Sequence, residues 1–265
     1  PDGRDRHSLW ANSNKGFPAV ADPLDREHND AWPGGRTNHY WFDLNRDWLP
    51  LAHPESKVKV AWYHQWYPNV TTDFHEMGTN STYFFEPTKP YGSENPVVPR
   101  KNYDEINPKF AQYFARYMDK IGSLYWSKEV FDNSYPGYGS TYPDMHGGLG
   151  LVFETASSRG HVQRSQRGDI TFAFTIRNHV VNSLATMEAA LDNRVYMHEY
   201  LREFFTSAVA EGSKDLAKNY VFGDETDPSR NRLFLQFLLD HKILLSRVCP
   251  LGNFHRMRQK HSLWP

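Results

Sequence analysis

The sequence predicts an α/β fold, because short apolar runs alternate with longer segments in which apolar residues recur every three to four positions. Runs typical of strands occur at residues 69–75, 82–85 and 150–154, and segments typical of helices at 52–66, 108–124 and 170–211. The chain of 265 residues is long enough for one large domain. Aromatic residues make up 15% of it, so a sizeable core can form although the mean hydropathy is low.

The first elements follow a long irregular stretch. Residues 1–56 are rich in Asn, Asp, Arg, Gly and Pro, which favours loop. The helix expected at 52–66 leads into the strand at 69–75, and a second strand follows at 82–85. Prolines and glycines interrupt the polar residues 87–102, which therefore predict another loop.

The middle of the chain pairs a helix with a buried strand. At 108–124 the apolar positions have helical spacing: Phe110, Tyr113, Phe114, Tyr117, Ile121 and Leu124. Residues 134–148 contain four glycines and predict a long loop of the kind that often contributes to function. The apolar run that follows predicts a buried strand that ends in the carboxylate of Glu154.

A long helical pattern occupies 170–211, and we expect this helix to pack on the sheet. Its apolar positions are Val180, Leu184, Met187, Leu191, Val195, Leu201, Phe205 and Ala208. Beyond Gly212, residues 219–222 are a candidate strand and 228–241 a candidate helix that begins with Pro228. We therefore divide the chain into a main part, 1–211, and an accessory segment or domain with α/β character, 212–265.

Bulk composition excludes several classes of protein. The net charge is −1 and the pI is near 7, so no basic excess exists for a nucleic acid or a membrane surface. Cys249 is the single cysteine, which excludes an internal disulfide and a cysteine-based metal site. No run of 18 apolar residues occurs. The chain opens with Pro-Asp-Gly rather than Met, and we expect it to be a piece of a longer protein.

His75 is a candidate metal ligand. It ends the strand that reads Asp-Phe-His at 73–75, and ligands bind at the carboxyl ends of strands in open α/β sheets. A neutral imidazole at that edge can ligate zinc, with Asp73 and Glu76 as possible partners. The alternative is an ordinary hydrogen-bonded histidine, since the helical His-Glu-x-x-His motif is absent.

Glu154 is a candidate general base. A carboxylate after three apolar residues is expected at the mouth of a pocket, where partial burial raises its pKa. The alternative is a surface residue or an ion pair with Arg159.

Two further segments contain candidate ligand-binding residues. Asn45 and Arg46 lie in an Asp-Leu-Asn-Arg-Asp segment, and the planar fork of Arg46 matches a carboxylate. An ion pair of Arg46 with Asp43 or Asp47 is the structural alternative. Tyrosines and glycines alternate at 135–142, where a tyrosine can close over a bound ligand or simply form a surface turn.

The order of these segments resembles the zinc carboxypeptidase family typified by carboxypeptidase A. That family has, in the same order, an Asn-Pro-Asp-Gly segment, an Asp-x-Asn-Arg segment, an Asp-x-His strand end, a mobile tyrosine and a Phe-Glu strand end. Large bacterial members with Asp-Leu-Asn-Arg-Asp-Trp and Glu-x-Ala-Ser-Ser-Arg-Gly segments are the most similar, the latter at 154–160 here. The resemblance covers roughly residues 1–180.

The resemblance implies a mixed, mostly parallel sheet flanked by helices, incomplete here, and a zinc-dependent hydrolase that removes C-terminal residues from peptides. By the same resemblance, His75 is a zinc ligand and Glu154 the general base. Asn45 and Arg46 would hold the terminal carboxylate of the substrate. Tyr138 would be the mobile tyrosine, with Tyr135 as the alternative. A secreted or periplasmic location is also implied.

The sequence departs from the family pattern at two places. The His-x-x-Glu pair that supplies two zinc ligands lies upstream of the Pro-Asp-Gly segment, so we expect this chain alone to be inactive. The arginine that stabilises the oxyanion is not in register, and Lys15 or an asparagine is a possible substitute. Two alternatives remain open: an aspartoacylase-like amidohydrolase acting on small acyl-amino acids, and a metal-free peptide-binding module.

Overall fold

The computed structural model describes residues 9, 12–15, 17–29, 36–248 and 254–256. It has an α/β fold with a mixed sheet, which confirms the predicted class in its general form. Lys15 lies in the described part, whereas Cys249 and the Pro-Asp-Gly segment lie outside it.

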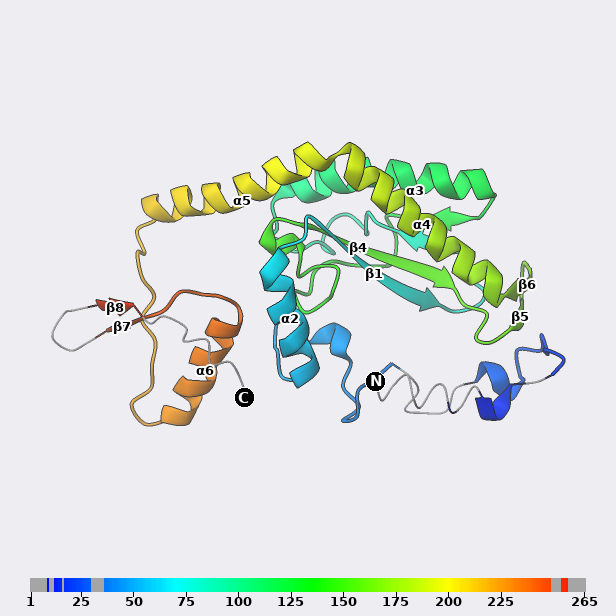
Figure 1. Ribbon diagram of the computed structural model, residues 1–265, viewed down its shortest axis with the longest axis horizontal. Coiled ribbons are helices and arrows are strands. Elements are labelled where there is room, and N and C mark those ends of the chain that lie inside the picture. Colours follow the sequence, from blue (N-terminus) through cyan, green and yellow to red (C-terminus); the bar gives the residue numbers. More distant parts are fainter. Residues whose placement is uncertain (1–8, 10–11, 16, 30–35, 249–253, 257–265) are drawn as a thin grey trace.

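Helices and strands alternate along the chain (Figure 1). The longer helices are α2 (Pro54–Trp66), α3 (Asn107–Ile121), α4 (Phe172–Asp192), α5 (Arg194–Lys214) and α6 (Pro228–Asp240). The short helical turns are η1 (Arg26–His28), η2 (Leu44–Arg46), η3 (Asn102–Ile106) and η4 (Asp144–His146). The strands are β1 (Val70–Met77), β2 (Tyr83–Phe85), β3 (Tyr125–Trp126), β4 (Leu149–Ala156), β5 (Val162–Ser165), β6 (Gly168–Thr171), β7 (Ser246–Val248) and β8 (Phe254–Arg256).

The main sheet has four strands in the order β1-β4-β2-β3. Strands β1 and β4 are parallel, β4 and β2 antiparallel, and β2 and β3 parallel. The register of β1 and β4 places His75 opposite Glu154, although the two residues are far apart in the sequence. Both side chains are therefore brought to the same region of the sheet by strand pairing alone.

Helix α3 shows how local sequence determines an element. Pro108 lies in its first turn, where the N–H that proline lacks would have no partner within the helix. Gly122 ends the helix with a left-handed φ of 66°. Its apolar face places Phe110, Phe114 and Met118 in the core, each with no exposed surface. The expected helix at 108–124 is therefore confirmed over most of its length.

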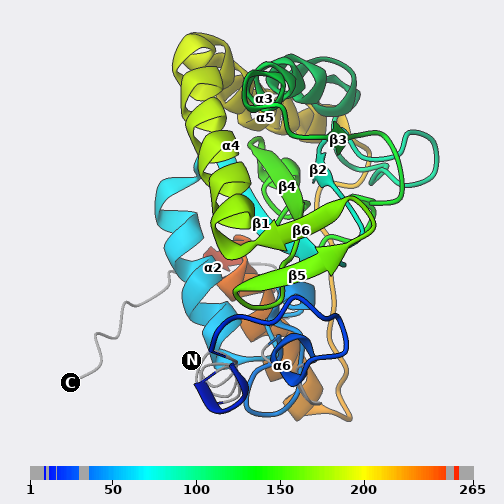
Figure 2. The same ribbon diagram turned by 90° about the vertical axis from the view of Figure 1, so that its right-hand side faces the viewer.

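The core lies between the sheet and the layer formed by α3 and α4, which run along one side of it while α2 lies on the other (Figures 1 and 2). Phe153 of β4 stacks on Phe74 of β1 with ring centroids 4.8 Å apart, and the ring of Phe114 meets Phe153 edge-on at 4.9 Å. Aromatic packing thus joins the two central strands to the helical layer.

The expected helix at 170–211 divides into α4 and α5 at Asn193. The backbone of Asn193 leaves the helical region (φ −102°, ψ 12°), and its side chain donates a hydrogen bond to the carbonyl of Ala189. Helix α4 packs against β4 as expected, with Ala185 and Ala189 in the core, but the larger apolar residues of the pattern in α4 are exposed. Val180 is 51% exposed and Leu191 62% exposed.

The accessory segment contains α6 and the β7–β8 hairpin, but the strand expected at 219–222 does not form. Tyr220 and Val221 are 85% and 80% exposed, and no described strand pairs with them, so their high β-propensity has no sheet to join. The division at residue 211 stays a prediction.

A chain of hydrogen bonds fastens the end of α6 to the main part. His241 Nε2 donates to the carbonyl of Leu49, so its Nδ1 accepts from the hydroxyl of Tyr142. The oxygen of Tyr142 in turn accepts from Nε2 of His64, at 2.8 Å. The described residues contain no helix with both the length and the hydropathy of a membrane span.

Candidate functional site

A pocket of about 120 Å³ lies over β1 and β4, bordered by the segments around residues 45 and 135. It is lined by Arg36, Asn45, Arg46, Asp73, His75, Phe131, Asp132, Tyr138, Ser140, Val152 and Glu154. All five residues that the sequence singles out as catalytic, binding or metal-ligating are therefore among those that line one pocket.

Asn45 is the centre of the polar contacts in this pocket. Its Nδ2 donates to Asp73 Oδ2 at 2.9 Å and lies 2.9 Å from Nε2 of His75. Its Oδ1 accepts from the backbone N–H of Gly139 at 2.8 Å. The η2 turn that presents Asn45 is capped by Asp43, whose carboxylate accepts from the N–H of Asn45.

Gly139 permits this close approach of two segments. A Cβ at position 139 would lie 2.9 Å from Asp73 Oδ2 and 3.1 Å from Asn45 Oδ1. Two more hydrogen bonds join the same segments, from Tyr135 Oη to the carbonyl of Arg46 and from the N–H of Trp48 to the carbonyl of Gly137. The glycines predicted as loop residues thus allow the loop to pack directly on the segment around Asn45.

His75 forms an ion pair with Asp73, with Nε2 2.8 Å from Oδ1. Burial alone would lower the pKa of His75, but the hydrogen bond and the charge of Asp73 outweigh it, and the net shift is upward. Asp73 shifts the other way. Burial raises its pKa, but the contacts with His75 and Asn45 produce a net decrease. No described residue hydrogen-bonds Nδ1 of His75, which leaves that nitrogen available to a ligand.

Glu154 is buried, with 9% of its surface exposed. Burial raises the pKa of its carboxyl to about 7, and the nearby charges of His75 and Arg36 oppose this increase. No ion pair joins Glu154 to Arg159 among the described residues, so the alternative of a Glu154–Arg159 ion pair does not hold. A carboxyl with this environment can exchange a proton near neutral pH.

The guanidinium of Arg46 lies 4.4 Å above the ring of Tyr138, and its NH1 donates to the carbonyl of Asn45. The same NH1 lies 3.7 Å from Asp43 Oδ2, so the ion pair expected as the structural alternative forms only weakly. Asp47 instead accepts from the N–H groups of Ala52 and His53, at the start of α2.

Tyr138 lines the pocket, whereas Tyr135 uses its hydroxyl to fasten the loop to Arg46. Burial, and then the charge of Asp132, raise the pKa of Tyr138, so its phenol stays neutral and can donate a hydrogen bond. Tyr138, and not Tyr135, is therefore the tyrosine of this loop that lines the pocket.

Sequence reasoning missed Arg36, which also lines the pocket and bonds Asp43 through Nε at 2.8 Å. Lys15, considered as a substitute for the missing arginine, donates to Asn12 Oδ1 and does not line the pocket. Arg36 directly follows Pro-Gly-Gly, a sequence that favours turns but does not say which residues the chain then meets. The sequence therefore contains no sign that Arg36 approaches His75.

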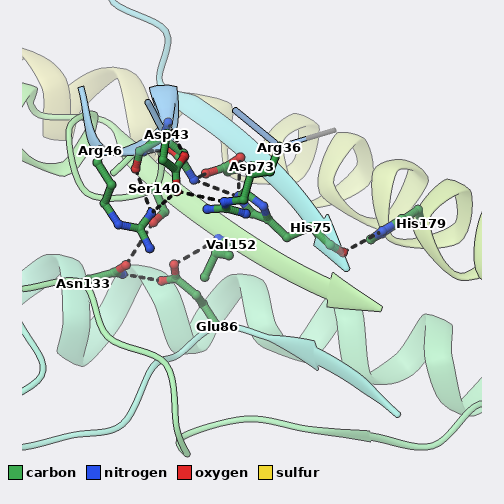
Figure 3. Close-up of polar contacts among 12 residues, drawn as sticks. Arg36, Asp43, Arg46, Asp73, His75, Glu86, Asn133, Ser140, Val152 and His179 are labelled. Carbon is green, nitrogen blue, oxygen red and sulfur yellow. Dashed lines mark hydrogen bonds and ion pairs between the residues drawn. The ribbon is translucent and has the colours of Figure 1, made fainter. Parts of the chain in front are cut away.

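A fully buried carboxylate supports the pocket from behind (Figure 3). Glu86 accepts hydrogen bonds from the N–H of Val152 at 3.0 Å and from the side-chain amides of Asn133, at 2.9 Å, and Asn107. Asn133 Oδ1 then accepts from the hydroxyl of Ser140 in the pocket wall. Glu86 therefore anchors both β4 and the loop that presents Ser140 and Tyr138.

The described residues do not make a complete zinc site. Zinc in a hydrolase is held by three protein ligands, and no group of three His, Cys, Asp or Glu residues with suitable geometry occurs in the described part of the chain. His75 fits the role of one ligand, because Asp73 orients its ring through Nε2 while Nδ1 has no partner there.

No protein-family model matches the sequence, and no curated protein or solved structure matches it.

Proposed function

We propose that this pocket binds the free C-terminal carboxylate of a peptide, and that the protein is part of a carboxypeptidase-type hydrolase that cleaves the adjoining peptide bond. The observation that best supports this proposal is that one pocket combines Arg46 and Arg36 with Glu154 and His75. Such a reaction uses cations to hold the substrate carboxylate and a buried carboxyl to transfer a proton.

Arg46 is the residue that we assign to the substrate carboxylate. Its bond to the carbonyl of Asn45 orients the guanidinium, and 48% of the side chain remains exposed to solvent. Arg36 contributes a second positive charge to the same pocket. The amide of Asn45 is engaged by Asp73 and Gly139, so we assign Asn45 to positioning these groups rather than to direct contact with the ligand.

Glu154 is the group that we assign to proton transfer. In the proposed reaction, water adds to the carbonyl carbon of the last peptide bond and Glu154 accepts a proton from that water. The C–N bond then breaks, and Glu154 returns the proton to the leaving amine. The hydroxyl of Tyr138 can donate a hydrogen bond to the bound ligand, and the guanidinium of Arg46 lies above its ring.

Zinc dependence stays a prediction from the sequence resemblance, with His75 as one of the residues that would hold the metal. Peptides and acyl-amino acids both present a carboxylate near an amide, and the peptide is the substrate class that we propose.

The carboxylate-binding step can be tested by calorimetry with N-benzoylglycyl-L-phenylalanine and its C-terminal amide. We expect the acid to bind at least about tenfold more tightly than the amide, because a charge-assisted bond to arginine contributes about 1.5–3 kcal/mol. Arg46→Met should remove most of this preference, with Arg36 left as the remaining cation of the pocket. Arg164→Met is the matched control, since Arg164 pairs with Asp169 on the β5–β6 hairpin and does not line the pocket.

Equal affinity of wild-type protein for acid and amide would overturn the proposal. So would an Arg46→Met variant that retains the full preference for the acid. Because the readout is binding, it does not depend on metal or on turnover.

A further inference from the structure

Helix α4 buries small and polar side chains and leaves large apolar side chains exposed to solvent. Its buried positions are small or polar: Thr175, Asn178, Asn182, Ala185, Thr186 and Ala189. Six of its exposed positions are large and apolar: Phe172, Ile176, Val180, Leu184, Met187 and Leu191. A surface helix normally has the opposite distribution. An exposed apolar side of this kind is typical of an interaction surface.

These six exposed residues, which we name the α4 stripe, form one continuous row. They follow each other in steps of four or three, which places them along one face of the helix. Each is between 45% and 67% exposed. Together they expose on the order of 600 Å², at the upper end of the largest apolar patch on a typical monomer.

The stripe contains no charge, because the charged residues of α4 are turned toward α3 and the turn after it. Glu188 bonds Arg116 and Tyr117, and Asp192 accepts from the hydroxyl of Tyr113. Arg177 donates to Ser123. A partner for this face therefore needs an apolar surface rather than charged groups.

We propose that the α4 stripe is the interface at which two copies of this chain associate. Contact of the stripe with the same stripe of a second copy is self-complementary, since a row of side chains spaced by four residues packs into the matching groove of an identical helix. Two copies would bury about 1,200 Å² from the stripe residues alone, the lower limit for a stable specific interface.

A membrane surface is the less suitable partner. A helix that lies in a bilayer interface has a lysine- and arginine-rich face opposite its apolar one. The face of α4 opposite the stripe is instead packed against the core and has no such cluster. None of the residues that line the pocket belongs to α4, so this inference is independent of the proposed function.

Sedimentation velocity across a broad range of protein concentration tests the inference. We expect wild-type protein to form a reversible dimer, and Val180→Glu with Leu184→Glu to weaken it on the order of a hundredfold or more. The matched control is Val58→Glu with Trp62→Glu on α2. These residues are also four apart and largely exposed, at 72% and 62%, and the control should dimerise as wild type does.

A cross-linking experiment keeps the test valid if the charged variant does not fold. Leu184→Cys in a Cys249→Ser background should form a disulfide-linked dimer on mild oxidation, and Val58→Cys in the same background should not. A wild-type protein that is monomeric at all concentrations would overturn the inference. Equal effects of the glutamate variants on α4 and on α2 would also overturn it, and so would equal cross-linking of Leu184→Cys and Val58→Cys. Binding of monomers to neutral phosphatidylcholine vesicles through the α4 stripe would overturn it as well.

Discussion

Replacement of Glu86 by glutamine should remove a large pH dependence from the stability of this protein. Glu86 has no exposed surface, and burial raises the pKa of its carboxyl from 4.5 to about 7. The hydrogen bonds from Asn133, Val152 and Asn107 oppose this increase, and the charge of Asp73 adds to it. The folded protein therefore binds a proton at Glu86 over a pH range in which the unfolded chain has released it.

The sign of the effect follows from this difference in proton binding. A carboxyl whose pKa is raised on folding contributes stability below its unfolded pKa and loses it as the pH rises through its folded pKa. A shift from 4.5 to about 7 corresponds to about 3 kcal/mol. Wild type should lose about that much relative to Glu86→Gln between about pH 4 and about pH 8.

Urea denaturation at several pH values, monitored by tryptophan fluorescence, measures this difference. Burial lowers the pKa of His64 to about 4 and also lowers that of His241, which makes stability fall with decreasing pH in both proteins. Subtracting one profile from the other cancels that contribution. Glu129→Gln, in an exposed loop, is the control and should follow wild type. A constant difference between wild type and Glu86→Gln across the pH range would show that Glu86 does not bind a proton on folding.

Two other substitutions test the packing of the loop and of the accessory segment. Gly150→Ala should destabilise the protein by about 3 kcal/mol or more in urea denaturation, because its Cβ would overlap the backbone carbonyl of Ser140. Gly212→Ala, with open space around the added carbon, should instead raise stability by up to about 1 kcal/mol, and similar effects of the two would contradict this account. His241→Ala removes the bonds to Leu49 and Tyr142, so amide hydrogen exchange in α6 should accelerate about tenfold. Unchanged exchange in α6 would show that these bonds do not hold it.

Much of the candidate site was predictable because each residue follows a local pattern. His75 and Glu154 each directly follow a phenylalanine in a strand-like segment, and Asn45 and Arg46 stand together in a short polar segment. The parallel pairing of β1 with β4 then places the first two opposite each other. Their positions near the carboxyl ends of two strands therefore follow from local patterns, although both strands continue two residues further than predicted.

Other parts of the site depend on contacts between segments distant in the sequence. Arg36 reaches the pocket through its bond to Asp43, and Glu86 reaches Ser140 only through Asn133. Such residues follow no local sequence pattern, because their partners come from segments that are distant in the sequence and meet only in the folded chain.

Hydrophobic periodicity acts over a few neighbouring residues, so the sequence was enough to predict the α/β class and the approximate places of the principal helices and strands. It did not predict that β1 and β4 each continue two residues beyond His75 and Glu154. That 219–222 has no strand to pair with, and that the apolar side of α4 faces outward, became visible in the tertiary structure. Periodicity identifies the apolar side of a helix, but what covers that side depends on surfaces that come together only when the chain folds and associates.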